Sequence, residues 1–220
     1  MRVVIAGGHG QIALRLERLL AARGDSPVGL IRNPGQADDV ERTGAEAVVC
    51  DLEQAQAGPL AAHLTGADAV VFAAGAGPGS GVARKFTVDR DASVLLADAA
   101  EQAGVRRFLQ VSSMGAGAPP QPGSDEVWAA YITAKTEAED DLRGRDLDWT
   151  ILRPGGLTND PGTGLVTLAA PPVPRGTVTR DDVAAVLIAL LDTPGTDRLT
   201  LELTNGDVPI HEAVQRLAKP

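Results

Sequence analysis

The sequence has a single cysteine, Cys50, among 220 residues. One cysteine excludes an intramolecular disulfide and a cysteine-based metal cluster, and nothing in the cysteine usage indicates an oxidising compartment. We expect Cys50 to be a small apolar residue that closes a strand. The three histidines, His9, His63 and His211, are far apart and lack the spacing of metal ligands, so no metal site is predicted.

The sequence also lacks a cluster of basic residues and a long apolar run. Twenty-nine acidic and twenty basic side chains give a net charge of −9, which disfavours nucleic acid as a partner. The longest strongly apolar stretch, Val183 to Leu191, is too short to span a bilayer, and the first strand pattern begins at residue 2. We therefore expect a soluble, cytoplasmic protein without a membrane partner.

What is present is an alternation of apolar runs and helical patterns. Repeated strand–helix units predict an α/β fold with a doubly wound parallel sheet. At 220 residues and 44 % hydrophobic content, we expect one domain over residues 1–220, with residues from about 155 forming a small cover over a substrate. The predicted strands that follow the N-terminal one are Val28–Ile31, Ala47–Cys50, Ala69–Phe72, Arg107–Val111 and Trp149–Leu152.

The segments between and after these strands are helical or rich in turns. Asp91–Ala103 is rich in alanine and is followed by Gly104, a typical helix stop. Two Gly- and Pro-rich stretches, Gly75–Gly81 and Gly115–Ser124, follow strands, so they should overhang the sheet edge where ligands bind. The later predicted elements are a helix from Asp181, a strand over Leu199–Leu203 and a short helix over Ile210–Leu217.

Residues 2 to 23 predict a buried strand that passes through a glycine turn into an amphipathic helix. The run Val3–Ile5 is typical of a parallel strand covered on both faces, and apolar residues recur at helical spacing from Ile12 to Leu20. The turn fits Gly-x-Gly-x-x-Ala and Gly-x-x-Gly-x-x-Ala, both of which end at Ala13. Its place between strand and helix favours a dinucleotide site over a plain strand–turn–helix unit.

The physical reason is that glycines allow the backbone to approach a pyrophosphate, while the free N–H groups at a helix start attract the anion. A small residue at position 13 keeps the helix close to the sheet. A histidine in such a turn is more often a solvated loop residue than a phosphate ligand, so no chemistry is assigned to His9. The residues of this segment that we expect at the cofactor are Gly7, Gly8, His9, Gly10, Gln11 and Ile12.

Tyr131 and Lys135 lie four residues apart in a predicted helix, so they share one face of it. A phenol is a poor acid–base catalyst at neutral pH, and a neighbouring ammonium stabilises its ionised form. The strand that ends at Val111 is followed by Ser112 and Ser113, whose hydroxyls should reach the ligand edge of the sheet. There they could donate a hydrogen bond to a substrate oxygen.

The sequence resembles the short-chain dehydrogenase/reductase superfamily over nearly the whole chain. The resemblance consists of a strand, a glycine turn, Ser113, Tyr131 and Lys135, in this order. The sequence is most similar to atypical short members that bind NAD(P), of the NmrA-like, epimerase-like and biliverdin/flavin reductase-like groups. The resemblance implies that Ser113 is the catalytic hydroxyl, Tyr131 the proton donor and Lys135 the ribose-binding lysine. The alternative interpretation assigns these residues no catalytic role. Tyr131 is then an ordinary half-buried aromatic, Lys135 a solvated helix residue and Ser113 a cap or turn former.

Arg32 follows the second strand, where NAD-preferring proteins place an acidic residue, and an arginine suits a 2′-phosphate. We therefore predict NADP as cofactor, with NAD possible, although Arg32 could simply be exposed. Asp51 could likewise be a solvated acid, and Arg153 could be structural. The further cofactor-binding positions that the resemblance implies are Asp51, Leu52, Ala73, Ala74, Gly75, Pro154 and Gly155.

Two departures from the superfamily pattern shape the hypothesis. No counterpart is found for the asparagine that completes a proton relay, and the part after Arg153 is short for a nucleotide-sugar epimerase. The segments expected to line the substrate pocket are 75–82, 115–128 and 157–175, and Met114, Trp128 and Leu157 could form an apolar wall of this pocket. Because these segments show no charge cluster, a neutral substrate is favoured.

Together these patterns predict an oxidoreductase that transfers a hydride between NADP and a small carbonyl-type substrate. One alternative is a non-catalytic NmrA-like protein that senses the redox state of NAD(P). Another is an epimerase or dehydratase of the nucleotide-sugar type. The presence of both Tyr131 and Lys135 favours an enzyme over a sensor, and the oligomeric state is not predicted.

Overall fold

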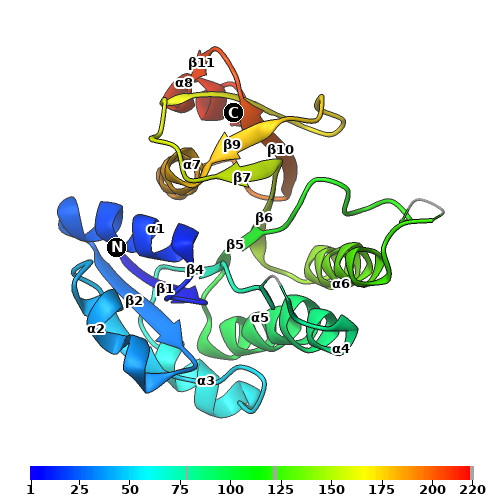
Figure 1. Ribbon diagram of the computed structural model, residues 1–220. Coiled ribbons are helices and arrows are strands. Elements are labelled where there is room, and N and C mark those ends of the chain that lie inside the picture. The colour runs from blue at the N-terminus through cyan, green and yellow to red at the C-terminus, as the bar shows by residue number, and fades with distance from the viewer. Residues whose placement is uncertain (78, 121–122, 219–220) are drawn as a thin grey trace.

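A nine-stranded sheet flanked by helices forms the centre of the protein, shown by a computed structural model that describes residues 1–77, 79–120 and 123–218 (Figure 1). Residues 78 and 121–122, within the two predicted Gly- and Pro-rich loops, lie outside the described residues. The strands of the sheet are β1 (Arg2–Ala6), β2 (Ser26–Ile31), β3 (Glu46–Val49), β4 (Ala69–Phe72), β5 (Arg107–Val111), β6 (Asp148–Pro154), β8 (Leu165–Ala169), β10 (Leu199–Asn205) and β11 (Val208–Pro209).

The strand order is β3-β2-β1-β4-β5-β6-β10-β8-β11. From β3 to β10 all neighbours are parallel, and the predicted doubly wound α/β fold is confirmed. The prediction misses the far edge of the sheet, where β8 runs antiparallel to both β10 and β11. It also misses a separate two-stranded parallel sheet of β7 (Gly156–Thr158) and β9 (Thr177–Thr179). These strands are short and lie among Gly and Pro residues, so their sequence signal is weak.

Helices cover both faces of the sheet (Figure 1). The α-helices are α1 (Gln11–Ala22), α2 (Ala37–Glu41), α3 (Ala57–Leu64), α4 (Val82–Arg84), α5 (Ala92–Ala103), α6 (Glu126–Arg143), α7 (Arg180–Asp192) and α8 (Ile210–Gln215). The other helical segments are the 3₁₀ turn η1 (Pro34–Gln36) and the π-helical η2 (Lys85–Asp91). None of the helices in the described part of the chain is both long enough and apolar enough to cross a membrane.

The apolar residues of β1 pack alternately in two hydrophobic clusters. Val3 and Ile5 pack in the cluster that holds the apolar residues of α1 and α7, whereas Val4 and Ala6 pack in the cluster that contains those of α3 and α5. A strand covered on both faces has no polar face, which is why this run shows no alternation. The C-terminal part contributes to the first cluster through Val178 of β9 and residues of α7, β8 and β10, so it shares a core with β1 and α1.

The helix before β5 is longer than its sequence pattern indicates. The predicted segment begins at Asp91, but the structure is helical from Val82 onward, through α4 and η2 into α5. A π-helix widens the turn, is rare, and is found mostly at functional sites. At its other end the prediction holds, because Gly104 caps α5 in the left-handed conformation with φ 72°.

A buried acid lies beneath the glycine turn. Glu17 of α1 is completely buried, and its Oε2 accepts a 3.3 Å hydrogen bond from the hydroxyl of Thr43. Its Oε1 has no hydrogen-bond partner among the described residues and would lie 2.6 Å from a Cβ placed on Gly29. Burial raises the pKa of Glu17 from 4.5 to about 8.

This raised pKa predicts a loss of stability with increasing pH. Between pH 4.5 and about 8 the folded protein retains a proton on Glu17 that the unfolded chain releases, so stability falls as pH rises through this window. The slope is at most about 1.4 kcal/mol per pH unit. Glu17→Gln should show a smaller fall in melting temperature between pH 5 and pH 8 than the wild type, measured by circular dichroism. The control is Glu41→Gln at an exposed position, and equal slopes in wild type and Glu17→Gln would contradict the prediction.

Candidate functional site

Two adjoining cavities lie at the carboxyl ends of the parallel strands, the edge where open α/β sheets bind ligands. The first has a volume of about 310 Å³ and lies over β1, β2 and the chain after β3. The second has about 800 Å³ and lies between the ends of β5 and β6, η2 and α6. Ala73, Ala74 and Gly75, which follow β4, line both, so the two cavities meet at these residues.

The glycine turn forms one wall of the first cavity through Gly7 and Gly10. Gly7 has φ +80°, and a Cβ there would lie 2.6 Å from the Cα of Ala74. A Cβ on Gly10 would lie 2.9 Å from the carbonyl oxygen of Gly7. The turn therefore uses the spacing Gly-x-x-Gly, and the N–H groups of the first turn of α1, which starts beside the cavity, lack intrahelical partners and suit an anion.

The other residues of this turn are placed differently from one another. Gly8 lines neither cavity: its N–H donates to Leu30 O at 2.9 Å, and a Cβ on it would lie 2.7 Å from Gly29 Cα. Its small size thus lets the turn pack against β2. Gln11 is exposed and also lies outside both cavity walls, whereas His9 lines the first cavity and Ile12 the second.

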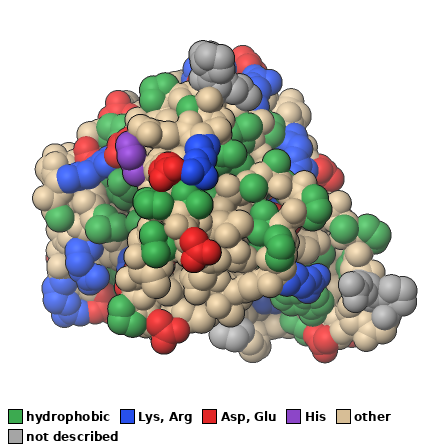
Figure 2. Space-filling view, turned by 90° about the horizontal axis from the view of Figure 1, so that it is seen from above, with side chains coloured by type: hydrophobic (Ala, Val, Ile, Leu, Met, Phe, Trp, Pro, Cys, Tyr) green, Lys and Arg blue, Asp and Glu red, His purple; other side chains and the backbone are tan. Residues whose placement is uncertain are grey.

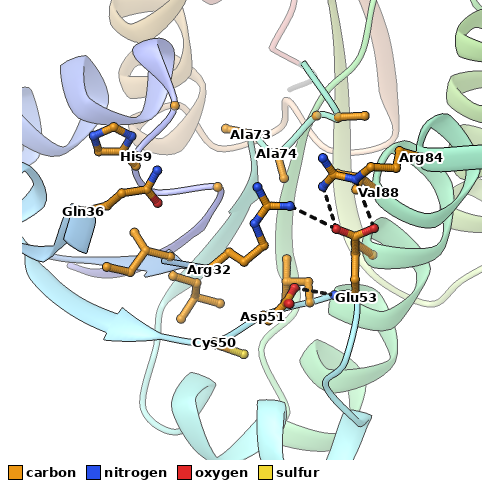
Figure 3. A pocket seen from close by; sticks show the side chains of 18 residues that line it. His9, Arg32, Gln36, Cys50, Asp51, Glu53, Ala73, Ala74, Arg84 and Val88 are labelled. Atoms are coloured by element: carbon orange, nitrogen blue, oxygen red, sulfur yellow. Dashed lines mark hydrogen bonds and ion pairs between the residues drawn. The ribbon is translucent and has the colours of Figure 1, made fainter. Parts of the chain in front are cut away.

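Three predicted residues, Arg32, Asp51 and Leu52, also line the first cavity. Figure 3 shows Arg32 and Asp51 at the end of the cavity away from His9. The side chain of Arg32 is 56 % exposed, and its Nη1 lies 3.3 Å from Glu53 Oε2. Arg84 of α4 donates to the same oxygen at 2.6 Å, so two guanidinium groups meet at one carboxylate (Figure 3). The hydrogen bond from Arg84 holds the pKa of Glu53 below its usual value. Neither Glu53 nor Arg84 was predicted from the sequence.

The three predicted catalytic residues, Ser113, Tyr131 and Lys135, all line the second cavity, as do Pro154 and Gly155. The predicted apolar wall of this cavity is present as well. Its members Met114, Trp128 and Leu157 line the cavity, and the ring of Trp128 lies 5.5 Å from that of Tyr131, centroid to centroid.

The two serines after β5 have different roles. The hydroxyl of Ser112 is buried and donates to Glu139 Oε1 at 2.5 Å, away from solvent. Ser113 is only partly buried, and the one bond of its hydroxyl is a long one of 3.3 Å to Met114 O. Of the pair, Ser113 is therefore the hydroxyl that is free to reorient toward a ligand.

Lys135 is not a solvated helix residue, since only 3 % of it is exposed. Its ammonium donates to Val111 O at 3.1 Å and lies 3.3 Å from Asp89 Oδ1 and 5.9 Å from the centroid of the Tyr131 ring. Asp89, on η2, is also buried, and its other oxygen accepts a 3.2 Å hydrogen bond from the N–H of Ala76. The sequence offered no partner for Lys135, and the structure supplies one from a helix far away in the chain.

A buried charge network lies behind these residues. Glu139, four residues after Lys135 on α6, is completely buried and accepts from Arg153 Nε at 2.9 Å and from Arg143 Nη2 at 2.7 Å. Together with its bond to Ser112, Glu139 thus ties α6 to the ends of β5 and β6. Arg153 therefore has the structural role that the sequence analysis considered for it, because its guanidinium binds a buried carboxylate.

Nothing in the described residues provides a metal centre, because no group of three or more His, Cys, Asp or Glu side chains is placed to hold an ion.

Comparison with known proteins extends over nearly the whole chain. A family model described as NAD(P)H-binding matches residues 7–194. The Bacillus subtilis protein named "Uncharacterized sugar epimerase YhfK" is 39 % identical over 218 residues, which cover 99 % of this chain and 100 % of that protein.

Two solved structures are also similar. The "Putative NAD-dependent epimerase/dehydratase" from Bacillus halodurans superposes with a TM-score of 0.90 at 36 % identity, covering 99 % of this chain and 100 % of that one. The oxidoreductase ylbE from Lactococcus lactis gives a TM-score of 0.86 at 28 % identity, covering 99 % and 96 %.

The network behind the cavity predicts a large effect of Glu139→Ala on stability. The change leaves the guanidinium of Arg153, itself 6 % exposed, buried without its carboxylate. Breaking a buried pair in this way costs about 3–5 kcal/mol. Urea denaturation should show this loss at an unchanged m-value.

The matched control is Asp140→Ala, which removes the neighbouring carboxylate, 66 % exposed, from Arg143. This exposed pair should contribute at most about 1 kcal/mol. Equal losses in the two variants would show that the Glu139 network is not a principal support of the site.

Proposed function

The chain belongs to the NAD(P)H-binding family, with a Rossmann-type fold, and we propose that it is an oxidoreductase of the short-chain dehydrogenase/reductase type. The proposed reaction is hydride transfer between a nicotinamide cofactor, with NADP preferred, and a small carbonyl-type substrate. One observation carries the proposal: Ser113, Tyr131 and Lys135 line a cavity that joins the glycine-turn cavity at Ala73–Gly75. Cofactor and substrate could thus meet beside Tyr131.

The residues present fit a dinucleotide. The turn at Gly7 and Gly10 has no space for a Cβ, and it leads into the start of α1, where N–H groups suit a pyrophosphate. A nicotinamide cofactor, when bound, supplies or accepts the hydride. Beyond the glycine turn, the residues that would hold it are Arg32, Asp51 and Leu52 at the adenosine end, Ala73, Ala74 and Gly75 in the middle, and Lys135, Pro154 and Gly155 at the nicotinamide end.

The chain's own residues would handle the proton. In the reducing direction the Tyr131 hydroxyl gives its proton to the carbonyl oxygen, while Ser113 donates a hydrogen bond to the same oxygen. The ammonium of Lys135 stabilises the phenolate that remains, and Asp89 holds that ammonium in place. The apolar side chains of Met114, Trp128 and Leu157 would limit access of water to this end of the cavity.

A second candidate, epimerisation, is favoured by the names of the B. subtilis and B. halodurans proteins. An epimerase could use the same tyrosine and the same cofactor, but it returns the cofactor to its starting state in each cycle. The two functions differ in a measurable way, because only an oxidoreductase changes the nicotinamide absorbance in proportion to product.

Tyr131 is the only tyrosine of the chain, so Tyr131→Phe removes the one phenol. Loss of the proton donor should lower kcat by about 10²–10⁴-fold. The Kd for NADPH, measured by nicotinamide fluorescence, should stay within about twofold, because the ring is retained. Turnover is followed by NADPH oxidation with a panel of small carbonyl compounds.

The control is Thr133→Val, which removes a hydroxyl from the same helix outside the lining of both cavities. It should leave kcat unchanged. A Tyr131→Phe enzyme with the rate of the wild type would rule out Tyr131 as the proton donor.

Arg32→Ala tests the preference for NADP. A 2′-phosphate should lose a charge-assisted hydrogen bond, which corresponds to about a tenfold higher Kd for NADPH at an exposed position. The Kd for NADH should change by less than about twofold, since NADH has no 2′-phosphate. Nicotinamide fluorescence titration gives both values.

Arg42→Ala serves as the control, since this arginine is 70 % exposed and lines neither cavity. If Arg32→Ala weakens the binding of NADPH and NADH equally, Arg32 does not determine a preference for NADP. Absence of binding by both nucleotides to the wild type would refute the proposed function itself.

A further inference from the structure

Lysine is rare in this chain and is concentrated at one place. Only three of the twenty basic residues are lysines, Lys85, Lys135 and Lys219. Lys85 and Lys135 both line the second cavity, and they are only 8 % and 3 % exposed. Lysine is seldom buried to this degree unless its charge has a partner.

The two buried lysines differ in their partners. Lys135 forms an ion pair with Asp89, whereas Lys85, the first residue of η2, has no ion-pair partner among the described residues. The ammonium of Lys85 donates to the carbonyl oxygen of Gly77 at 3.0 Å. An ammonium has three donors and a full charge, so one carbonyl leaves it incompletely satisfied.

Lys85 is directed at the reaction centre. Its Nζ lies 5.4 Å from the centroid of the Tyr131 ring, slightly closer than the 5.9 Å of Lys135 Nζ. Lys85 and Asp89 stand four residues apart on η2, and both line the same cavity. The π-helical segment thus presents one lysine that has no carboxylate partner among the described residues and one acid that is paired with Lys135.

The acids of the cavity wall are already engaged. Those lining it are Asp89, which is paired with Lys135, and Asp125, whose Oδ1 caps α6 by accepting from Trp128 N at 3.0 Å. Against these two acids, the described lining residues include four bases, the two lysines together with Arg175 and Arg180.

The excess of positive charge is therefore local. The chain as a whole carries −9, and acidic and basic side chains are interspersed on the face seen in Figure 2. Arg175 and Arg180 come from the C-terminal part, which lines this cavity together with η2, α6 and the strand ends. A cavity lined by an excess of one charge attracts ligands of the opposite sign.

We infer that the substrate of this cavity carries a carboxylate, which is bound by the ammonium of Lys85. This inference rests on the proposed function and names its substrate class, and it replaces the neutral substrate that the sequence favoured. Of the two buried ammonium groups, the one of Lys85 has no carboxylate partner among the described residues, and beside the apolar side chains of Trp128 and Leu157 it fits an apolar body with one carboxylate.

The test compares acids with their neutral counterparts. Benzoic, phenylacetic and cinnamic acid are each paired with the primary amide, and binding to protein saturated with NADP⁺ is measured by ligand-observed NMR. We expect the wild type to bind the acids at least about fivefold more tightly than the amides. Lys85→Met should lose this preference, and Lys85→Arg should keep part of it, because the charge remains.

Arg216→Met is the matched control, since it removes one positive charge from a side chain that is 61 % exposed and lies outside the cavity. It should retain the preference of the wild type. Amides that bind as well as acids overturn the inference, and so does binding of neither member of any pair. A preference for acids that survives in Lys85→Met also overturns it.

Titration of the same proteins, free of NADP⁺, with NADPH, followed by nicotinamide fluorescence, separates this outcome from failure of the proposed function. Nucleotide that binds to wild type and Lys85→Met alike, with no preference for acids, refutes the substrate class alone. Wild-type protein that binds no nucleotide refutes the proposed function. Melting temperatures within about 3 °C of the wild type show that Lys85→Met is folded.

Discussion

The parallel direction of the central strands is the constraint on which the site depends. It places the carboxyl ends of β1, β2, β4, β5 and β6 at one edge, and with them the glycine turn, Arg32, Ala74, Ser113 and Pro154. These residues are far apart in the chain and come together because each follows a strand. At Gly7 the backbone of Ala74 occupies the space of a Cβ, so the wall that the two cavities share at Ala74 requires a glycine beside it.

Buried ion pairs hold this edge in place. Asp89 with Lys135 and Glu139 with Arg153 are desolvated pairs, and such pairs contribute little net stability compared with apolar packing. Their value lies in geometry, because each fixes a charged group by bonds from two or more elements. The hydroxyl of Ser112 donates its hydrogen bond to Glu139, so the neighbouring Ser113 supplies the hydroxyl that is available to a ligand. Tyr131 thus stands among polar groups whose positions the fold determines.

The cavity and the surface differ in charge. On the surface, arginines are paired with acids, as Arg145 is with Asp98, Glu101 and Asp141. Inside the second cavity the balance is reversed, and Lys85 has no carboxylate of its own among the described residues. An acidic protein can therefore hold a basic site, and its net charge says little about the ligand of that site.

The sequence by itself determined the strand–turn–helix unit, the boundaries of β4 and β5, and the joint placement of Ser113, Tyr131 and Lys135, because periodicity, glycine and strand ends are local signals. The tertiary structure alone decided which charges meet. The pairing of Lys135 with Asp89 and the cluster of Arg84 and Glu53 at the far end join segments that have no common pattern. In the described part of the chain, packing likewise leaves Lys85 without a carboxylate partner. The antiparallel edge at β8 was hidden for the same reason: a partner strand or a partner charge is selected by packing in three dimensions, which spacing along one chain does not encode.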